Sequence, residues 1–306
     1  MGVLITWEDR NVAEEGHHIY RAQTSMAGLT PDQLPPPLDS VGPDVTEYED
    51  GTVTNGETYF YRVGAFTASG TVVLVSEEIE VVAQEAQVPT ANLMRFYVMD
   101  DLSGSLLPDS SGTQDATASS VALVPGRAGF GDALKSTSAS SGKVDIGLFD
   151  YTGQKTFSCW LYIEGPLSGT GSLLANGRNG TAYDTLAVSV SYDGSSHKVS
   201  ALWRGDNSTN SGASDILASL ETVDPLAIGK WLHVALVQDE PDVALYLDGE
   251  LIASDTLTRA IQPSHYSFGF FNITEHSGRG IEYRVDHQRI YNAALTASEV
   301  MALANE

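Results

Sequence analysis

The sequence predicts an all-β protein that consists of two β-sandwich domains with one short helix near its C-terminal end. Three observations predict this class. Asn-Gly and Asp-Gly turn signals recur along the chain, and they separate short runs rich in Val, Ile, Tyr and Phe. Such spacing is typical of β-sandwiches and jelly rolls. The length of 306 residues favours two domains rather than one.

The boundary between the domains is predicted in the stretch VVAQEAQVPTANL, residues 81–93. A strand is expected to end near Ala83, a short polar stretch follows, and Pro89 stiffens the crossing. We therefore expect one domain at residues 1–86 and a second at residues 90–306.

Three pieces of the first segment resemble a fibronectin type III module. They are LITWED at residues 4–9, GHHIYRAQ at 16–23 and NGETYFYRVGAFTASGTV at 55–72, which are similar to strands B, C and F of that family. Tyr59 matches the corner tyrosine, whose hydroxyl bonds to upstream backbone. Because Trp7 falls on the second strand of the pattern, the resemblance implies that the first strand is absent or supplied from elsewhere.

Residues 229–254 predict a meander of three strands. Residues 231–238 form one apolar run, and residues 243–247 alternate at period two. The dipeptide Asp248-Gly249 then separates this run from a third one. Asp-Gly between alternating runs is a strong hairpin signal, because both turn residues tolerate positive φ.

One helix is predicted close to the C-terminal end. Thr296 and Glu299 form a capping-box pattern immediately before the apolar residues Val300, Met301 and Leu303. This pattern places the start of the helix at Thr296.

Five pieces of the second segment resemble, in family order, the laminin-G-like, concanavalin A-like jelly-roll family. They are LMRFYVMDDLSGSLLPDSSG, VPGRAGFGDALKS, TFSCWLYI, the 229–254 meander and YRVDHQRIYNAALTASEVMAL. The two resemblances together imply a fibronectin type III-like β-sandwich followed by a concanavalin A-like jelly-roll sandwich and a short helix.

The charge of the chain is strongly negative, with 40 acidic and 16 basic residues and a formal net charge of −24. A nucleic-acid surface needs clustered Lys and Arg, and none is present, which also excludes anionic membrane surfaces. No apolar run approaches the ~18 residues that membrane insertion needs. Residues 1–88 carry 15 acids against 3 bases. This charge indicates either a solvated surface or docking on a basic partner.

The compartment is inferred from Cys159 and from the first residues. Cys159 alternates with Phe157 and Leu161, which predicts a buried free thiol, and a single cysteine excludes an intramolecular disulfide. The start of the sequence shows no basic n-region followed by a long apolar run, so no secretory signal is readable. We therefore expect synthesis in a cytosol.

Catalytic motifs are not found, so we expect a protein that is not an enzyme. The sequence holds no G-x-S-x-G elbow, P-loop or H-E-x-x-H motif. Glu282 and Asp286 share one face of a predicted strand, about 13 Å apart at ~3.3 Å per residue. Glycoside hydrolysis needs two carboxylates at ~5 to 9 Å, so this pair fits poorly.

A structural calcium is the one cofactor that we consider. The resemblance to the jelly-roll family implies oxygen ligands from Asp109, in the Asp-Ser-Ser-Gly loop, and from Asp286, in the closing strand. The family often has a second acid directly after the latter position, where this chain has His287. The alternative is that Asp109 caps a turn and that Asp286 bonds to backbone.

Two loops combine aromatic and polar residues in the manner of a glycan site. One offers Trp203 with Arg204, Asp206 and Asn207. The other offers His265, Tyr266 and Asn272. Exposed aromatic rings stack on sugars, but most aromatic residues of an all-β chain lie in the core. Both interpretations stay open for each loop.

Two display modules that lack a signal, a disulfide and a membrane segment are best explained by a bacteriophage virion. Virion parts are made inside the host and act outside it. We therefore predict a virion structural protein of the tail, fibre or capsid surface, whose jelly roll binds host-surface glycan. The alternatives are a bacterial extracellular carbohydrate-binding protein and, less favoured, a glycanase.

The first domain is predicted to be the anchor. The strand at GVLITWED contains no proline or lysine, the residues that commonly prevent an edge strand from pairing with other chains. Unpaired strand edges act as templates for such pairing. We expect a partner to add a strand there, either another virion protein or a second copy in a homo-oligomer.

Overall fold

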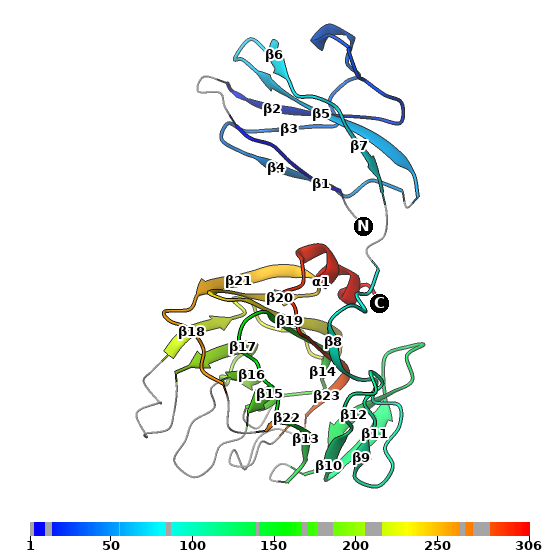
Figure 1. The fold of residues 1–306 in the computed structure, drawn as a ribbon, viewed down its shortest axis with the longest axis vertical. Helices are drawn as coiled ribbons and strands as arrows, with labels where there is room; N and C mark the ends of the chain where they lie inside the picture. The colour runs from blue at the N-terminus through cyan, green and yellow to red at the C-terminus, as the bar shows by residue number, and fades with distance from the viewer. Residues whose placement is uncertain are drawn as a thin grey trace. The chain divides into compact units, whose positions relative to one another are not determined.

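The computed structural model describes the chain except for residues 1–2, 10–13, 55, 84–86, 139–140, 167–169, 177–185, 206–215, 264–266 and 272–281. The chain divides into two compact units, Met1–Ala86 and Gln87–Glu306 (Figure 1). Both units are built from β-strands, and the one α-helix among the described residues is that predicted near the C-terminal end. The predicted all-β class is therefore confirmed.

The first unit is made of two antiparallel sheets. One pairs β1 (Val3–Thr6) with β4 (Glu47–Asp50). The other has the order β3-β2-β5-β6, with β7 also paired to β5. Its strands are β2 (Gly16–Ala22), β3 (Asp39–Val41), β5 (Thr58–Phe66), β6 (Val72–Val75) and β7 (Ile79–Val82). A 3-10 turn covers Pro31–Gln33.

Apolar side chains from both sheets fill the core of the first unit. Ile5 of β1 packs in one cluster with Ile19 of β2 and Val63 of β5. The corner expected at Tyr59 is present, because its hydroxyl accepts a 3.0 Å hydrogen bond from the Thr54 backbone N–H. This contact ties the start of β5 to the upstream chain, as such corners do.

The second unit is a sandwich of two larger antiparallel sheets. The first, called here the β16 sheet, has the order β18-β17-β16-β15-β22-β13-β10-β9. Its strands are β9 (Leu106–Leu107), β10 (Ala116–Ser119), β13 (Lys143–Gly147), β15 (Gly171–Asn176), β16 (Leu186–Tyr192), β17 (His197–Arg204), β18 (Ile216–Glu221) and β22 (Phe268–Phe271).

The second sheet, called here the β23 sheet, has the order β11-β12-β23-β14-β19-β20-β21, and β8 pairs with β23. Its strands are β8 (Leu93–Tyr97), β11 (Val121–Pro125), β12 (Asp132–Ser136), β14 (Lys155–Ile163), β19 (Trp231–Asp239), β20 (Asp242–Leu247), β21 (Glu250–Thr256) and β23 (Tyr283–Tyr291). Strands β19, β20 and β21 form the meander predicted from the sequence. Asp248 and Gly249 have φ values of 51° and 87°, as the hairpin signal requires.

The core lies between the β16 and β23 sheets. Alternate residues of each strand point into it, so Phe157, Cys159 and Leu161 of β14 are all buried there. Cys159 is a free buried thiol, as predicted, and burial raises its pKa far above the ordinary value. In the described part of the chain, no helix has the length and apolar character of a membrane-crossing segment.

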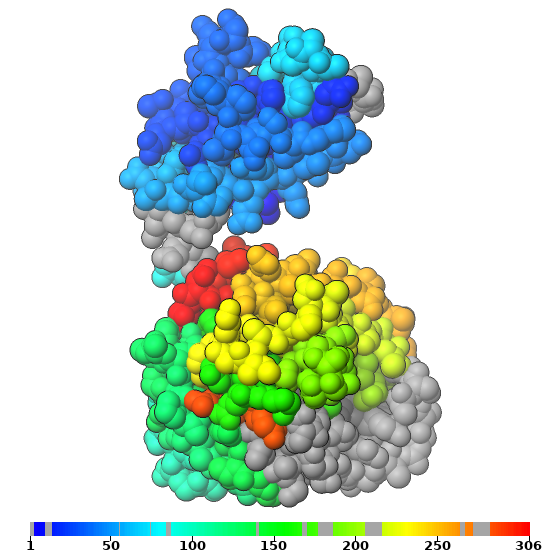
Figure 2. All heavy atoms as spheres, turned by 180° about the vertical axis from the view of Figure 1, so that it is seen from behind, coloured from blue at the N-terminus to red at the C-terminus, as the bar shows by residue number. Residues whose placement is uncertain are grey.

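The outer face of the β23 sheet is partly covered. Helix α1 (Ala297–Ala304) packs on it through Val300 and Leu303, against Ala235 and Tyr246. Thr296 and Glu299 form the predicted capping box at the start of the helix. In Figure 2 the red C-terminal segment lies against the orange segment that contains β21.

Candidate functional site

Trp203, the aromatic residue expected to be a glycan platform, lies in the core. Its side chain is 0% exposed, and its indole N–H donates a 2.8 Å hydrogen bond to the Gln238 side-chain oxygen. Gln238 in turn donates to the backbone oxygens of Tyr151 and Gly153. The expectation of an exposed ring is wrong, because Trp203 shares its strand face with buried Val199 and Ala201.

The other residues of the two expected glycan loops lie mostly outside the described part of the chain. Arg204 follows Trp203 in β17 and is half-buried. Asp206, Asn207 and Tyr266 lie outside the residues that the structure describes, as do His265 and Asn272.

Asp109 uses its carboxylate to close the loop in which it lies. One oxygen accepts hydrogen bonds from the backbone N–H groups of Phe96 and Ser111 and from the Ser111 hydroxyl. The other accepts from the N–H groups of Thr113 and Gln114. Burial alone would raise the pKa of Asp109, but these donors outweigh it and hold the pKa below the usual value. This is the turn-capping alternative considered above.

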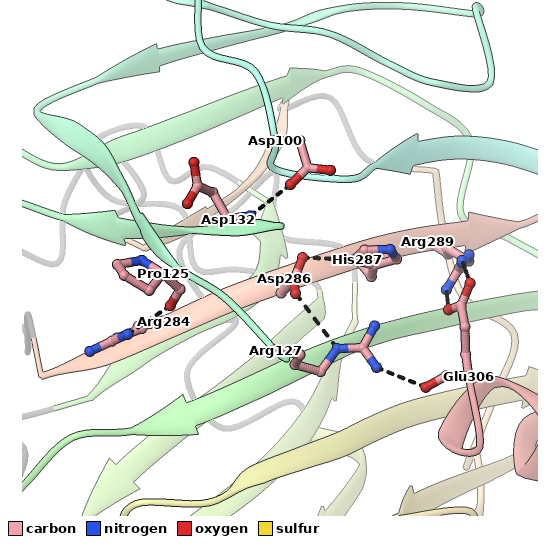
Figure 3. Close-up of polar contacts among 9 residues, drawn as sticks. All are labelled: Asp100, Pro125, Arg127, Asp132, Arg284, Asp286, His287, Arg289 and Glu306. Carbon is pink, nitrogen blue, oxygen red and sulfur yellow. Dashed lines mark hydrogen bonds and ion pairs between the residues drawn. The ribbon is translucent and has the colours of Figure 1, made fainter. Parts of the chain in front are cut away.

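Asp286 lies on the outer face of the β23 sheet under a covering loop (Figure 3). One oxygen is 2.7 Å from the His287 Nδ1, and the other is 3.6 Å from the Nε of Arg127. The Arg127 guanidinium also lies over the rings of Phe130 and Trp160, at 3.9 and 4.1 Å from their centroids. Asp286 therefore belongs to a buried cluster that already contains a cation.

His233 completes this cluster and is 1% exposed. Its ring meets that of Trp160 edge-on at 5.3 Å, and neither ring nitrogen has a hydrogen-bond partner. Burial, with smaller contributions from Arg289 and Arg127, lowers the pKa of His233 to about 3. The ring is thus neutral and buried.

These contacts do not fit a calcium ion held by Asp109 and Asp286. All the hydrogen bonds to Asp109 come from donors of its own loop and of β8, and a guanidinium stands where Asp286 would meet a metal. Among the residues that the structure describes, the two carboxylates also have no hydrogen-bond or ion-pair partner in common. A calcium site needs several oxygen ligands that converge on one point.

The outer face of the β23 sheet carries an aromatic pair that is half-buried. Tyr162 of β14 and Trp231 of β19 are directly opposite in the register, and their ring centroids are 5.3 Å apart at 53°. Arg284 of β23 is opposite Tyr162 on the other side, with its guanidinium 5.1 Å from the Tyr162 ring. Lys135 of β12 follows in the same line, opposite Arg284. We call Lys135, Arg284, Tyr162 and Trp231 the Trp231 row.

Glu164, which follows β14, holds the two cationic side chains of the Trp231 row in place. One Glu164 oxygen accepts a 2.6 Å hydrogen bond from the Arg284 Nε, and the other accepts from the Lys135 ammonium. All three side chains are about one quarter exposed. Burial raises the pKa of Glu164, but the two cations outweigh it, so the pKa lies below the usual value. Arg284 is also held by the Pro125 carbonyl oxygen, as Figure 3 shows.

The row combines what a sugar site needs. Aromatic rings offer apolar faces, and fixed charged groups beside them offer hydrogen bonds to hydroxyls. A groove of about 410 Å³ at β19 to β21 is the main alternative on this sheet. Its polar lining is made of Asp239, Asp242, Asp255, Ser254 and Thr256, and none of its lining residues is aromatic. The Trp231 row is therefore the better candidate.

The sequence did not single out Tyr162 and Trp231 as a pair, because they are far apart along the chain and meet only through the register of β14 and β19. One signal was present. Trp231 and His233 are out of phase with the apolar residues Leu232, Val234 and Leu236, so they point away from the core.

Residues 135–301 match the model of a family described as the concanavalin A-like lectin/glucanases superfamily. This match covers more than half of the chain, and it includes all four residues of the Trp231 row. No curated protein matches the sequence.

Two solved structures with a similar fold are in complex with sugars. Trypanosoma rangeli sialidase in complex with sialic acid is 18% identical with a TM-score of 0.57, over 82% of this chain and 43% of that one. The chain thus spans less than half the length of the sialidase. Domain 4 of AbnA, an extracellular arabinanase from Geobacillus stearothermophilus, in complex with arabinotriose, is 19% identical with a TM-score of 0.54, over 70% of this chain and 98% of that one. At these identities the likeness shows the fold.

Proposed function

Because the chain belongs to the concanavalin A-like lectin/glucanase superfamily, we propose that residues 90–306 are a carbohydrate-binding domain without catalytic activity. The observation that carries the proposal is the half-buried Tyr162–Trp231 pair on the outer face of the sheet, flanked by ion-paired Arg284 and Glu164. A sugar ring lies on the aromatic faces, and its hydroxyls bond to the charged groups.

The absence of catalysis is supported by how the candidate carboxylates are used. Asp286 is 0% exposed and faces Arg127, so it has no access to a substrate. Glu164 is kept ionised by two cations, which disfavours the raised pKa that a general acid needs. Glu282, the partner considered for Asp286, is half-buried and immediately precedes β23.

The proposal is tested by measuring binding of the full chain to arabinose oligosaccharides and to sialylated oligosaccharides, because relatives of the fold were solved with such sugars. Calorimetry gives the affinity, and a reducing-sugar assay detects hydrolysis. We expect binding without hydrolysis, and a loss of about tenfold or more in affinity for Trp231→Ala and Tyr162→Ala, which corresponds to at least ~1.4 kcal/mol.

Tyr192→Ala is the matched control. Tyr192 is also half-buried and also packs against an aromatic ring, that of His197, but it lies on the β16 sheet. Its substitution should leave the affinity unchanged. If the Tyr192 and Trp231 variants bind equally well, the site is elsewhere, and release of reducing sugar would instead support the glycanase alternative.

We also propose that residues 1–86 are a fibronectin type III-like module that anchors the protein to a bacteriophage virion. Support for the module comes from the two antiparallel sheets and from the corner hydrogen bond of Tyr59. Support for the anchor comes from β1, whose only partner among the described residues is β4. A strand from another virion protein would pair the second edge of β1.

The anchor is tested by deleting residues 1–86 and following incorporation into particles. We expect a folded jelly roll that no longer joins the particle. Normal incorporation would assign the anchor to residues 90–306, and self-association of the full chain alone would make the partner a second copy. Absence of the protein from a mass-spectrometric inventory of particles would favour the bacterial extracellular alternative.

A further inference from the structure

Three side chains of metal-ligating type meet in the first unit, apart from the carbohydrate site. Asp9 follows β1, Glu14 precedes β2, and His17 lies on β2. One potential ligand atom from each lies within 4.8 Å of the other two. In the part of the chain that the structure describes, no other group of three such side chains meets this spacing.

His17 distinguishes this group from an ordinary acidic surface. Its side chain is only 2% exposed, and its Nδ1 has no hydrogen-bond partner. Its Nε2 faces a carboxylate oxygen of Asp9 at 3.9 Å, which is too long for a hydrogen bond. The Trp7 ring packs on the imidazole at 5.4 Å. The 3.9 Å between Nε2 and the Asp9 oxygen is instead close to the spacing of two ligand atoms of one ion, and buried polar groups are normally satisfied.

We infer that Asp9, Glu14 and His17 bind a zinc-type dication, with water as the fourth ligand. Zinc is commonly bound by imidazole and carboxylate ligands at about 2.0 to 2.2 Å. Ligand atoms around such an ion are about 3.3 Å apart. The three ligand atoms, which lie within 4.8 Å of one another, therefore reach coordination distance through small side-chain movements.

The donor set and the charge both favour a transition-metal ion. Calcium and magnesium select oxygen ligands, whereas an imidazole nitrogen suits zinc and its neighbours. The 15 acidic and 3 basic residues at positions 1–88 also create a negative potential that concentrates cations.

The ion would act as a clip between the two sheets of the first unit. Asp9 is attached to β1, in the two-stranded sheet, while His17 belongs to β2, in the five-stranded sheet. Binding of the ion to the folded state alone raises stability by mass action. This role does not depend on the carbohydrate site.

The test uses the full chain after removal of metal, titrated with Zn²⁺ and followed by calorimetry and thermal melting. We expect one ion per chain, a higher melting temperature, and weaker binding of Ca²⁺. Asp9→Asn and Glu14→Gln should weaken Zn²⁺ binding at least tenfold. Glu15→Gln is the matched control, because Glu15 is an exposed neighbour outside the group and loses the same charge.

Histidine-ring nitrogen NMR of the unchanged protein then tests the part of His17, which avoids replacing a buried residue. One histidine should shift on addition of Zn²⁺. The inference is overturned if Zn²⁺ does not bind, if Glu15→Gln weakens binding as much as Glu14→Gln does, or if no histidine signal moves.

Discussion

Trp203 in β17 and Trp231 in β19 lie on different sheets of the second unit and in opposite environments. Trp203 is fully enclosed between the sheets, with its indole N–H bonded to Gln238. Trp231 is half-buried on the outer face of the β23 sheet, where its ring meets Tyr162. The residue beside a long polar loop is thus structural, and the residue at the start of an apolar run is the one on the outer face of its sheet.

The difference shows that the phase of a residue within its strand outweighs its position near a loop. Trp203 lies on the same strand face as Val199 and Ala201. Trp231 lies on the opposite strand face from Leu232 and Val234. Because side chains alternate across a strand, this phase decides which ring enters the core.

The largest effect is expected for Trp203→Ala. Removing a buried tryptophan leaves a cavity and an unpaired Gln238 oxygen, so the free energy of unfolding should fall by about 3 to 5 kcal/mol. Urea denaturation measures it. Trp231→Ala should cost less, about 1 kcal/mol, since its ring is only partly buried and lies outside the core. Equal losses for the two variants would contradict the assignment of one ring to the core and the other to the surface.

The next effect concerns His233, which is the next residue of β19 on the same face as Trp231 but is buried against the Trp160 ring. Its pKa falls from 6.5 to about 3 in the folded state through burial. The unfolded chain therefore binds a proton that the folded chain excludes. Between pH 6.5 and 3, this group removes stability as the pH falls, by up to about 1.4 kcal/mol per pH unit.

His233→Phe keeps the ring and removes the titration. Urea denaturation from pH 6.5 down to pH 5, above most carboxylate titrations, should show a shallower loss of stability for this variant than for the unchanged protein. Parallel curves would mean that the imidazole is hydrated, and that the open part of the face extends beyond Trp231.

Much of the fold could be predicted from the sequence, because the deciding residues act locally. The Asp248-Gly249 turn and the capping box of Thr296 and Glu299 need only their neighbours, and both are present in the structure. The candidate site was not predictable in this way. Tyr162, Trp231 and Arg284 meet through the pairing of three strands that are distant along the chain.

Asp286 shows the same limit for a charged residue. Its environment depends on Arg127, which reaches it from the loop between β11 and β12. Nothing near Asp286 in the sequence indicates that a guanidinium fills this position, so family resemblance pointed to calcium instead.

A smaller effect is expected for Glu164→Gln, which removes the anion that orders the Trp231 row. The pKa of Glu164 is lowered in the folded state, so its contribution is present above the unfolded pKa and is lost as the pH falls through the folded value. At neutral pH the variant should lose roughly 1 kcal/mol or less, because the ion pairs are partly exposed. Melts of both proteins should converge in acid and in high salt. A difference that persists in acid would assign the loss to packing rather than to charge.

The smallest effect is expected for calcium. Asp109 already accepts five hydrogen bonds, and Asp286 faces Arg127, so an ion would have to displace these partners before it gained any ligand. A ligand that binds the folded state raises the melting temperature, and roughly millimolar calcium would reveal even a weak site. We expect the melting temperature of the metal-free protein to be the same with and without calcium. A rise that Asp286→Ala abolishes would show that Arg127 moves aside for the ion, and that the covered end of this face opens as the end at Trp231 does.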